Sequence, residues 1–394
     1  MQFGTSMLRA GNTAVRTREC MDAMARKMDL DLVAVSLSLD SITATVRSSG
    51  HCATVMRAIG PPGVNAWRIG ELEQLARVVS PSTASHEIAA RLTGIESAPP
   101  LYSTMQIAVA IALASGSFAF LNGVGLPEMT AAAIGGGSAQ VLRSWLSRRH
   151  LNQYGTAALA AITASGLYVA LAALANSAGF GSSNYPAGFI ASVLFLVPGF
   201  PLIAALFDLL QYQTLAAISR LAHGMMILLA VAFGLTIVVG VAGVDISRQP
   251  PVELAYHFRL VLRAAASFIA ACAFAITFDS APRTVLAVGC SALVANDLRL
   301  VLIDTGWTLA SAAFLGALTI GLLAVFLDRR FNVPRMATTV APIVIMIPGL
   351  YAFEMIVLLN RGQVLEALQA CAQLGFAIGA LAMGLAAARF FVAR

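Results

Sequence analysis

"FLVPGFPLIAALFDLL", residues 195–210, is apolar enough to cross a membrane as a helix, yet it contains the pair Pro198-Gly199 and, ten residues after the proline, the carboxylate of Asp208. Proline lacks a backbone N–H donor and glycine tolerates non-helical dihedral angles, so this pair predicts a break in the helix. Backbone groups freed by a break are costly in hydrocarbon unless they face protein, water or a polar ligand. The segment therefore indicates either a kink held by neighbouring helices or one side of a binding site.

The composition of the chain is that of a membrane protein. Of its 394 residues, 58% are hydrophobic and 11% are charged, and the mean hydropathy is +0.81. Ordinary globular domains carry roughly a quarter charged residues, so we expect an integral membrane protein. The net charge of +6 comes mainly from arginines beside apolar segments, which argues against a nucleic-acid partner. The five cysteines are scattered and no Walker motif, catalytic triad or metal-ligand spacing appears, so we expect no cofactor, no metal and no enzyme activity.

The hydropathy divides the chain near "GIESAPPLYS", residues 94–103. Residues 1–100 predict a small α+β domain with one helix over 7–28, a β-hairpin that turns at Asp40-Ser41, and helices over 69–80 and 82–95. The first twenty residues lack the apolar core and cleavage site of a signal peptide, so we expect this domain in the cytoplasm.

The rest of the chain predicts a polytopic, mainly α-helical membrane protein. A helix needs about 20 apolar residues to cross the hydrocarbon layer. By this measure there are ten spans, over residues 104–122, 127–145, 154–177, 187–209, 215–242, 256–277, 282–302, 306–327, 337–359 and 363–388. If both termini are cytoplasmic, the arginines concentrate in the cytoplasmic loops, with Arg248, Arg259 and Arg263 as exceptions. We expect a multi-pass protein of the bacterial inner membrane.

A shift of 150 positions aligns residues 198–235 with residues 348–385 without a gap, so that Pro198-Gly199 meets Pro348-Gly349. We infer two five-span units, residues 101–245 and 246–394, each with a break at midplane depth. An odd number of spans makes the second copy run upside down. Inverted repeats with broken helices are typical of secondary transporters, which bind substrate near the midplane and alternate its access to the two sides. A channel would instead require continuous polar stripes along the spans.

Two acids within the spans are candidates for gating or ion coupling, because ionisable residues in a membrane are functional candidates by default. Asp208 follows Pro198 by about 15 Å of helix, which places it at the cytoplasmic mouth as an inner gate or as an interfacial acid that reaches water. Glu354 follows Pro348 by about 9 Å, on the outward half. It is either a carboxylate that exchanges a proton across the membrane or a buried acid paired with an arginine.

Other polar residues have simpler interpretations. His223, three residues after Arg220, is expected to be a neutral histidine in the core rather than a proton relay. Asp297 and Arg299 are expected to form an interfacial pair rather than a gate. A membrane enzyme would have to use the N-terminal domain, where the candidate side chains are Ser36, Ser38, Asp40, Ser41 and His51.

The order of these elements resembles the fused form of the threonine/serine exporter family over nearly the whole chain. The residues that match the family pattern are Gly11, Arg16, Met21, Pro198, Gly199, Asp208, Leu209, Leu210, Thr214, Leu215, Arg220, Asn332, Val333, Pro334, Pro348, Gly349 and Tyr351. The resemblance implies export of threonine and serine driven by the proton-motive force, with some two-chain relatives exporting small dicarboxylates such as succinate. The family usually has Gly-Asp where this chain has Tyr212-Gln213, and often Glu at His223.

We therefore expect a secondary active exporter of small amino acids, coupled to protons, with the lipid bilayer and a second copy of the chain as partners. The alternatives are an exporter of small dicarboxylates and a membrane-anchored hydrolase. The expected substrate-binding residues are Pro198, Gly199, Pro348, Gly349 and Tyr351. The expected coupling or gating residues are Asp208, Glu354, Arg220, His223 and Thr214.

Overall fold

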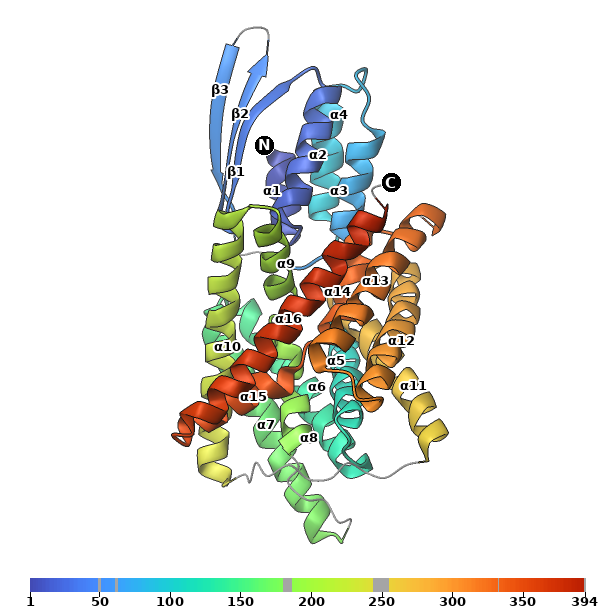
Figure 1. The fold of residues 1–394 in the computed structure, drawn as a ribbon. Helices are drawn as coiled ribbons and strands as arrows, with labels where there is room; N and C mark the ends of the chain where they lie inside the picture. The colour runs from blue at the N-terminus through green and yellow to red at the C-terminus, as the bar shows by residue number, and fades with distance from the viewer. Residues whose placement is uncertain (49–50, 61–62, 180–185, 244–254, 332, 393–394) are drawn as a thin grey trace.

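The computed structural model describes residues 1–48, 51–60, 63–179, 186–243, 255–331 and 333–392 (Figure 1). Arg248 and Asn332 lie outside these ranges. Within them the chain is mainly α-helical, with a small sheet near the N-terminus, as the sequence predicts. Figure 1 shows this sheet and the first four helices at one end of a long helical bundle.

The N-terminal domain combines four helices with a three-stranded antiparallel sheet of order β1-β2-β3. Its elements are α1 (Gln2–Arg9), α2 (Ala14–Lys27), β1 (Asp31–Leu37), β2 (Ser41–Ser48), β3 (His51–Ala58), α3 (Ala66–Val78) and α4 (Ser85–Ser97). The predicted hairpin turn at Asp40-Ser41 is confirmed, and β3 is a strand that the sequence analysis missed. β3 lies along β2 with Ala58 opposite Ser41.

The prediction of one continuous helix over residues 7–28 is wrong, because the chain turns between α1 and α2. Gly11 adopts a φ of +96°, which L-residues rarely do, and a Cβ there would lie 2.5 Å from the carbonyl oxygen of Gly63. Thr13 then caps α2 by accepting a hydrogen bond from the Arg16 amide at 3.3 Å. This α1–α2 turn carries the backbone of Asn12 and Ala14 to the surface that faces the bundle.

The bundle begins with α5 and ends with α16. Its helices are α5 (Thr104–Leu121), α6 (Leu126–Arg148), α7 (Gln153–Ser177), α8 (Pro186–Val193), α9 (Gly199–Leu210), α10 (Thr214–Ala242), α11 (Tyr256–Thr277), α12 (Pro282–Asp304), α13 (Leu309–Phe331), α14 (Arg335–Val344), α15 (Gly349–Asn360) and α16 (Val364–Val392). In the described part of the chain, seven of these are long and apolar enough to cross a membrane, or up to nine spans if each of two bent helix pairs is one span. The expected span over residues 127–145 is the helix α6, which does not reach this apolarity; it contains Glu128, Arg143 and Arg148.

Both predicted breaks are present and have the same local geometry. The helix axis bends by 64° between Ala187–Leu196 and α9, and by 46° between α14 and α15. Pro198 (φ −77°, ψ 58°) and Pro348 (φ −78°, ψ 73°) are each the centre of an inverse γ-turn, closed by the amide of the following glycine at 2.7 Å and 2.8 Å. The two Pro-Gly pairs therefore interrupt their helices in the same way.

The helices that follow the breaks run in opposite directions. Figure 1 shows α9 leading from its break toward the N-terminal domain, whereas α15 leads away from it. Accordingly α10 runs away from the N-terminal domain and α16 runs toward it.

Small residues allow close approach of helices within the bundle. A Cβ on Gly234 of α10 would lie 2.6 Å from the Ala158 carbonyl oxygen of α7, and a Cβ on Gly384 of α16 would overlap the Phe314 carbonyl oxygen of α13. Gly234 and Gly384 are 150 positions apart, so corresponding helices pack at corresponding positions. The apolar core of the N-terminal domain also includes Ala216 at the start of α10, which joins the domain to the bundle.

Candidate functional site

The two helix breaks pack against each other in the centre of the bundle. A Cβ on Gly199 would lie 3.1 Å from the Val344 side chain ahead of the second break. A Cβ on Gly349 would overlap the side chain of Leu194 ahead of the first break. Leu194 and Val344 are themselves 150 positions apart, so the contact is reciprocal. The predicted substrate-binding residues Pro198, Gly199, Pro348 and Gly349 thus lie together.

Tyr351 and Glu354 line a polar cavity of about 300 Å³ between α15 and α16. The other polar side chains that line it are Arg361, Glu366, Gln369 and Gln373. The Tyr351 amide donates to the Pro348 carbonyl oxygen at 3.1 Å, so the cavity begins one turn after the second break. Because α15 leads away from the N-terminal domain, the cavity lies in the far half of the bundle (Figure 1).

Asp208 and Arg220 form a buried ion pair at the other end of the bundle. The Arg220 Nε lies 3.2 Å from the Asp208 Oδ2, and the side chains are 4% and 0% exposed, respectively. The alternative that Asp208 reaches water is therefore wrong. The Ala14 amide donates to Asp208 Oδ1 at 3.0 Å, and Arg220 Nη2 donates to the Asn12 carbonyl oxygen at 2.6 Å.

The α1–α2 turn thus supplies one hydrogen bond to each member of this pair, while Asp208 Oδ2 and Arg220 Nε, which face each other, have no hydrogen-bond partner among the described residues. Sequence reasoning missed Asn12 and Ala14, which act here through backbone atoms. The signal that could have found the turn is "GNT" at 11–13, a glycine followed by two residues that favour turns and helix N-caps.

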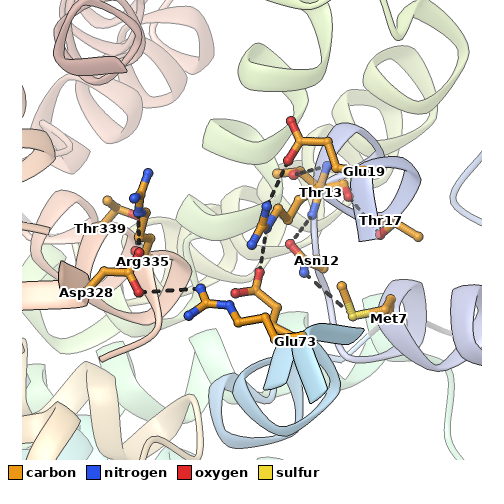
Figure 2. Close-up of polar contacts among 11 residues, drawn as sticks. Met7, Asn12, Thr13, Thr17, Glu19, Glu73, Asp328, Arg335 and Thr339 are labelled. Carbon is orange, nitrogen blue, oxygen red and sulfur yellow. Dashed lines mark hydrogen bonds and ion pairs between the residues drawn. The ribbon is translucent and has the colours of Figure 1, made fainter. Parts of the chain in front are cut away.

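Two further acids hold the N-terminal domain on the bundle. Asp279, between α11 and α12, accepts from Asn65 Nδ2 at 2.7 Å and from the Leu101 amide at 2.8 Å. Asp328, at the end of α13, lies 3.5 Å from Arg77 Nη2 and 2.6 Å from Arg335 Nε. Figure 2 shows Asp328 beside Arg335, and Glu73 and Glu19 near the α1–α2 turn. The domain is therefore bound to α9 and α10 on one side and to α11–α14 on the other.

The remaining predicted residues have peripheral places. His223 Nδ1 lies 3.2 Å from the Tyr154 hydroxyl, which links α10 to α7. Thr214 is the exposed first residue of α10. The expected Asp297–Arg299 pair is wrong for the described residues, because Arg299 bonds to Asn296 and the Met346 carbonyl oxygen. Asp304 instead pairs with Arg263 at 2.5 Å and with Arg259 at 3.6 Å. Its negative charge thus compensates two of the three arginines that lie outside the expected cytoplasmic loops.

Among the side chains that a hydrolase would need in the N-terminal domain, His51 lies apart from the serines and the aspartate of the β1–β2 turn. Ser38 donates to Asp40 at 2.5 Å and contacts Ser41 at 2.8 Å in the β1–β2 turn. The hydrogen bond from Ser38 lowers the pKa of the Asp40 carboxyl. His51 is opposite Ser48, at the end of β2 away from Ser41, which is about 23 Å of strand. Ser38, Asp40 and Ser41 therefore form a turn, and His51 is out of their reach.

Two family models match successive parts of the chain. The family model described as "Putative threonine/serine exporter" matches residues 1–242, and the model described as "Threonine/Serine exporter, ThrE" matches residues 263–391. The chain belongs to the threonine/serine exporter family. The relatives of this family member include the "Probable succinate transporter subunit YjjP" of Escherichia coli K12, which is 26% identical over 247 residues, or 62% of this chain and 93% of the relative. YjjP of Klebsiella aerogenes is 24% identical over 238 residues, or 59% of this chain and 89% of the relative. No solved structure matches.

In this threonine/serine exporter family member, Tyr212 stands in a conformation that suits glycine. Its φ is +59°, and Gly362, 150 positions later, has a φ of +76°. Tyr212 is 93% exposed, so its side chain fits without a clash despite the backbone conformation. The Gln213 amide then donates to the Asp208 carbonyl oxygen at 2.8 Å, which closes the α9–α10 turn beside the ion pair.

Proposed function

We propose that this chain is a secondary active exporter of small amino acids, threonine-like or serine-like, that moves them out of the cytoplasm in exchange for protons. Residues 101–245 and 246–394 would be inverted five-helix repeats, with α6 completing ten spans, and residues 1–100 a cytoplasmic domain in a bacterial inner membrane. The observation that carries the proposal is the reciprocal contact of Gly199 with Val344 and of Gly349 with Leu194. Two broken helices that cross at their breaks provide a pivot and non-helical backbone at midplane depth.

The bundle is closed at the N-terminal domain and hollowed on the far side. On the domain side, Asp208 and Arg220 fill the space between α9 and α10, and the α1–α2 turn covers them. On the far side, the space between α15 and α16 is the cavity lined by Tyr351 and Glu354. This arrangement supports an outward-facing state with an inner gate formed by Asp208, Arg220 and the N-terminal domain.

Proton coupling is assigned to Glu354. It is partly buried, it lines the cavity, and it lies on the first turns of the helix that follows the second break. An acid that lines an outward-facing cavity is placed to carry the coupling proton, and Glu354 lies about 9 Å along the helix from Pro348, where the backbone would hold the substrate. His223 and Thr214 lie on α10, near the inner gate, and would influence its opening.

A dicarboxylate is the second candidate substrate. It is favoured by the name of the YjjP relatives, succinate transporter subunits, which match 62% and 59% of this chain. A dicarboxylate and an amino acid share one carboxylate and differ in the second polar group. A single cationic side chain of the protein would therefore bind the shared carboxylate of either substrate.

The test is efflux from cells that express the full chain and are preloaded with labelled threonine, serine or succinate. We expect faster efflux of one of them than in cells without the chain, and loss of that gain in Glu354→Gln at matched expression. Glu87→Gln, which changes an exposed acid paired with Arg91 on α4, is the matched control and should export normally. Equal efflux with and without the chain for all three compounds would contradict the function. Normal, proton-dependent efflux in Glu354→Gln would contradict the coupling role alone.

A further inference from the structure

The repeat extends to α6 and α12, where it places two arginines at equivalent positions. Both helices have 23 residues, and a shift of 156 positions superposes Leu126 on Pro282 and Arg148 on Asp304. The same shift aligns "AQVLR", residues 139–143, with "ANDLR", residues 295–299. Arg143 therefore corresponds to Arg299, and the amide of Gln140 corresponds to that of Asn296.

Both arginines belong to the interior face of their helix. Ala132, Gly136 and Ala139 are buried and precede Arg143 at spacings of three or four residues. Val288, Ala292 and Ala295 are buried and precede Arg299 at the same spacings. Positions three and four apart share one helix face, so each guanidinium extends from a face that is otherwise packed with small residues.

The two arginines differ in their partners. Arg299 Nε donates to Asn296 Oδ1 at 3.0 Å, and Nη1 donates to the Met346 carbonyl oxygen at 3.3 Å, two residues before Pro348. Asn296 Nδ2 in turn donates to Ser267 Oγ at 2.8 Å. In the second repeat, the Arg299 guanidinium and the Asn296 amide oxygen are therefore hydrogen-bonded to each other.

In the first repeat, Arg143 and Gln140 do not bond to each other. Arg143 has neither an ion pair nor a hydrogen bond with any residue in the described ranges, and in those ranges the buried Gln140 Oε1 has no hydrogen-bond partner. The position that corresponds to Ser267 is Ile111, which is buried and offers no polar atom. A cation and an amide acceptor are thus left together on the half of α6 nearer the N-terminal domain, where Arg148 at the helix end bonds to Thr104.

We propose that Arg143 and Gln140 bind the substrate in the half of the bundle next to the N-terminal domain. The guanidinium takes a carboxylate, and the Gln140 oxygen accepts from an ammonium or hydroxyl group beside that carboxylate. An unpaired guanidinium on the packed face of a helix is costly, and because Arg143 is only partly buried, a ligand can reach it. A carboxylate is the anion that its planar fork fits best. The acceptor favours an α-amino carboxylate over an unsubstituted dicarboxylate. The assignment rests on the proposed transport function for its physiological meaning.

Thermal unfolding of the purified full chain tests binding without requiring transport. Threonine, serine and succinate are the probes, and threoninol, which lacks the carboxylate, is the negative probe. We expect an amino acid to raise the melting temperature, and threoninol to leave it unchanged. Arg143→Gln should weaken binding at least about tenfold, the low end for a charged hydrogen bond. Arg148→Gln, an exposed arginine on the same helix, is the matched control and should bind as the unchanged chain does.

The ligand-free variants separate a binding role from a structural one. Removal of an unpaired cation from the interior should leave the melting temperature of Arg143→Gln equal to or above that of the unchanged chain. A lower melting temperature would show that Arg143 stabilises the fold and would overturn the proposal. Undiminished binding by both Arg143→Gln and Arg143→Lys would also overturn it. So would the absence of any stabilisation of the unchanged chain by the probes. Binding that depends on Arg143 without any efflux would contradict the exporter function and leave the site in place.

Discussion

Asp208 of α9 and Arg220 of α10 form an ion pair with a 3.2 Å separation that the α1–α2 turn covers completely. The two residues come from the apolar bundle, whereas the Ala14 amide and the Asn12 carbonyl oxygen that bond to them come from the N-terminal domain. The pair therefore joins the two parts of the chain as well as two helices.

Asp208→Asn should destabilise the protein, because it leaves the Arg220 guanidinium buried without its counter-charge. Breaking one side of a buried pair costs roughly 3–5 kcal/mol. The melting temperature and the rate of proteolytic release of the N-terminal domain measure the effect. The double variant Asp208→Leu with Arg220→Met removes both charges and should lose less. A melting temperature unchanged in Asp208→Asn would mean that the pair does not hold the domain.

Gly349→Ala should disturb the crossing of the two breaks, since the added methyl group overlaps Leu194. Overpacking of this kind costs typically about 1–3 kcal/mol. Leu194→Ala should partly restore stability and efflux in the Gly349→Ala background, which a double-mutant cycle would report as coupling. Gly375→Ala on α16 is the control, because a Cβ at Gly375 meets nothing within 4 Å. Equal effects of the two alanine substitutions would count against the reciprocal contact.

Tyr212→Gly should stabilise the chain, because it relieves a non-glycine residue held at a φ of +59°. Such a conformation costs about 1–3 kcal/mol, part of which the flexibility of glycine in the unfolded chain offsets. We expect a net gain of about 1 kcal/mol in the free energy of unfolding, measured by denaturant titration in detergent. Gly362→Ala, at the equivalent turn, should show the opposite sign. A loss of stability in Tyr212→Gly would indicate that the tyrosine side chain makes a contact outside this chain.

Thiol labelling should distinguish the sides of the membrane. Cys52 is exposed on β3, whereas burial raises the pKa of the Cys20 thiol to about 11. A thiol with a raised pKa carries little reactive thiolate at neutral pH, so Cys20 should stay unlabelled below about pH 9.

A membrane-impermeant maleimide should label Cys52 in inside-out vesicles and leave it unlabelled in intact cells. Labelling of Cys52 in intact cells would place the N-terminal domain outside.

Local sequence chemistry predicted the breaks well. Pro198-Gly199 and Pro348-Gly349 dictate the turn by their own covalent structure, so no knowledge of neighbours was needed. The partners of Asp208 were beyond that reasoning. The Ala14 amide lies 194 positions away and the Asn12 carbonyl oxygen lies 208 positions from Arg220. Backbone groups of this kind have no sequence signature, and only the fold brings them to the pair.

The equivalence of Arg143 and Arg299 was hidden for a different reason. The first repeat has six more residues from the start of α7 to the start of α9 than the second has from the start of α13 to the start of α15. The shift of 150 that aligns the breaks therefore becomes 156 for the earlier helices. A single ungapped shift therefore aligns either the breaks or the earlier helices, but not both.

The prediction of a continuous helix over residues 7–28 was wrong because the apolar periodicity continues across the turn at Gly11. The φ of Gly11, +96°, does not continue a helix.

If the chain transports by the proposed movement of one half of the bundle against the other, the three acids that hold the N-terminal domain would also limit turnover. Asp208 belongs to one half of the bundle, whereas Asp279 and Asp328 belong to the other. A rigid body fastened to both halves cannot stay fastened to both while one half rotates against the other. In the proposed alternating-access cycle, each turnover would therefore release at least one of these attachments, and the strength of that attachment would limit how readily the domain separates from the bundle. In this exporter family member, undocking of the domain would be a step in the cycle with its own rate, separate from the binding and release of substrate.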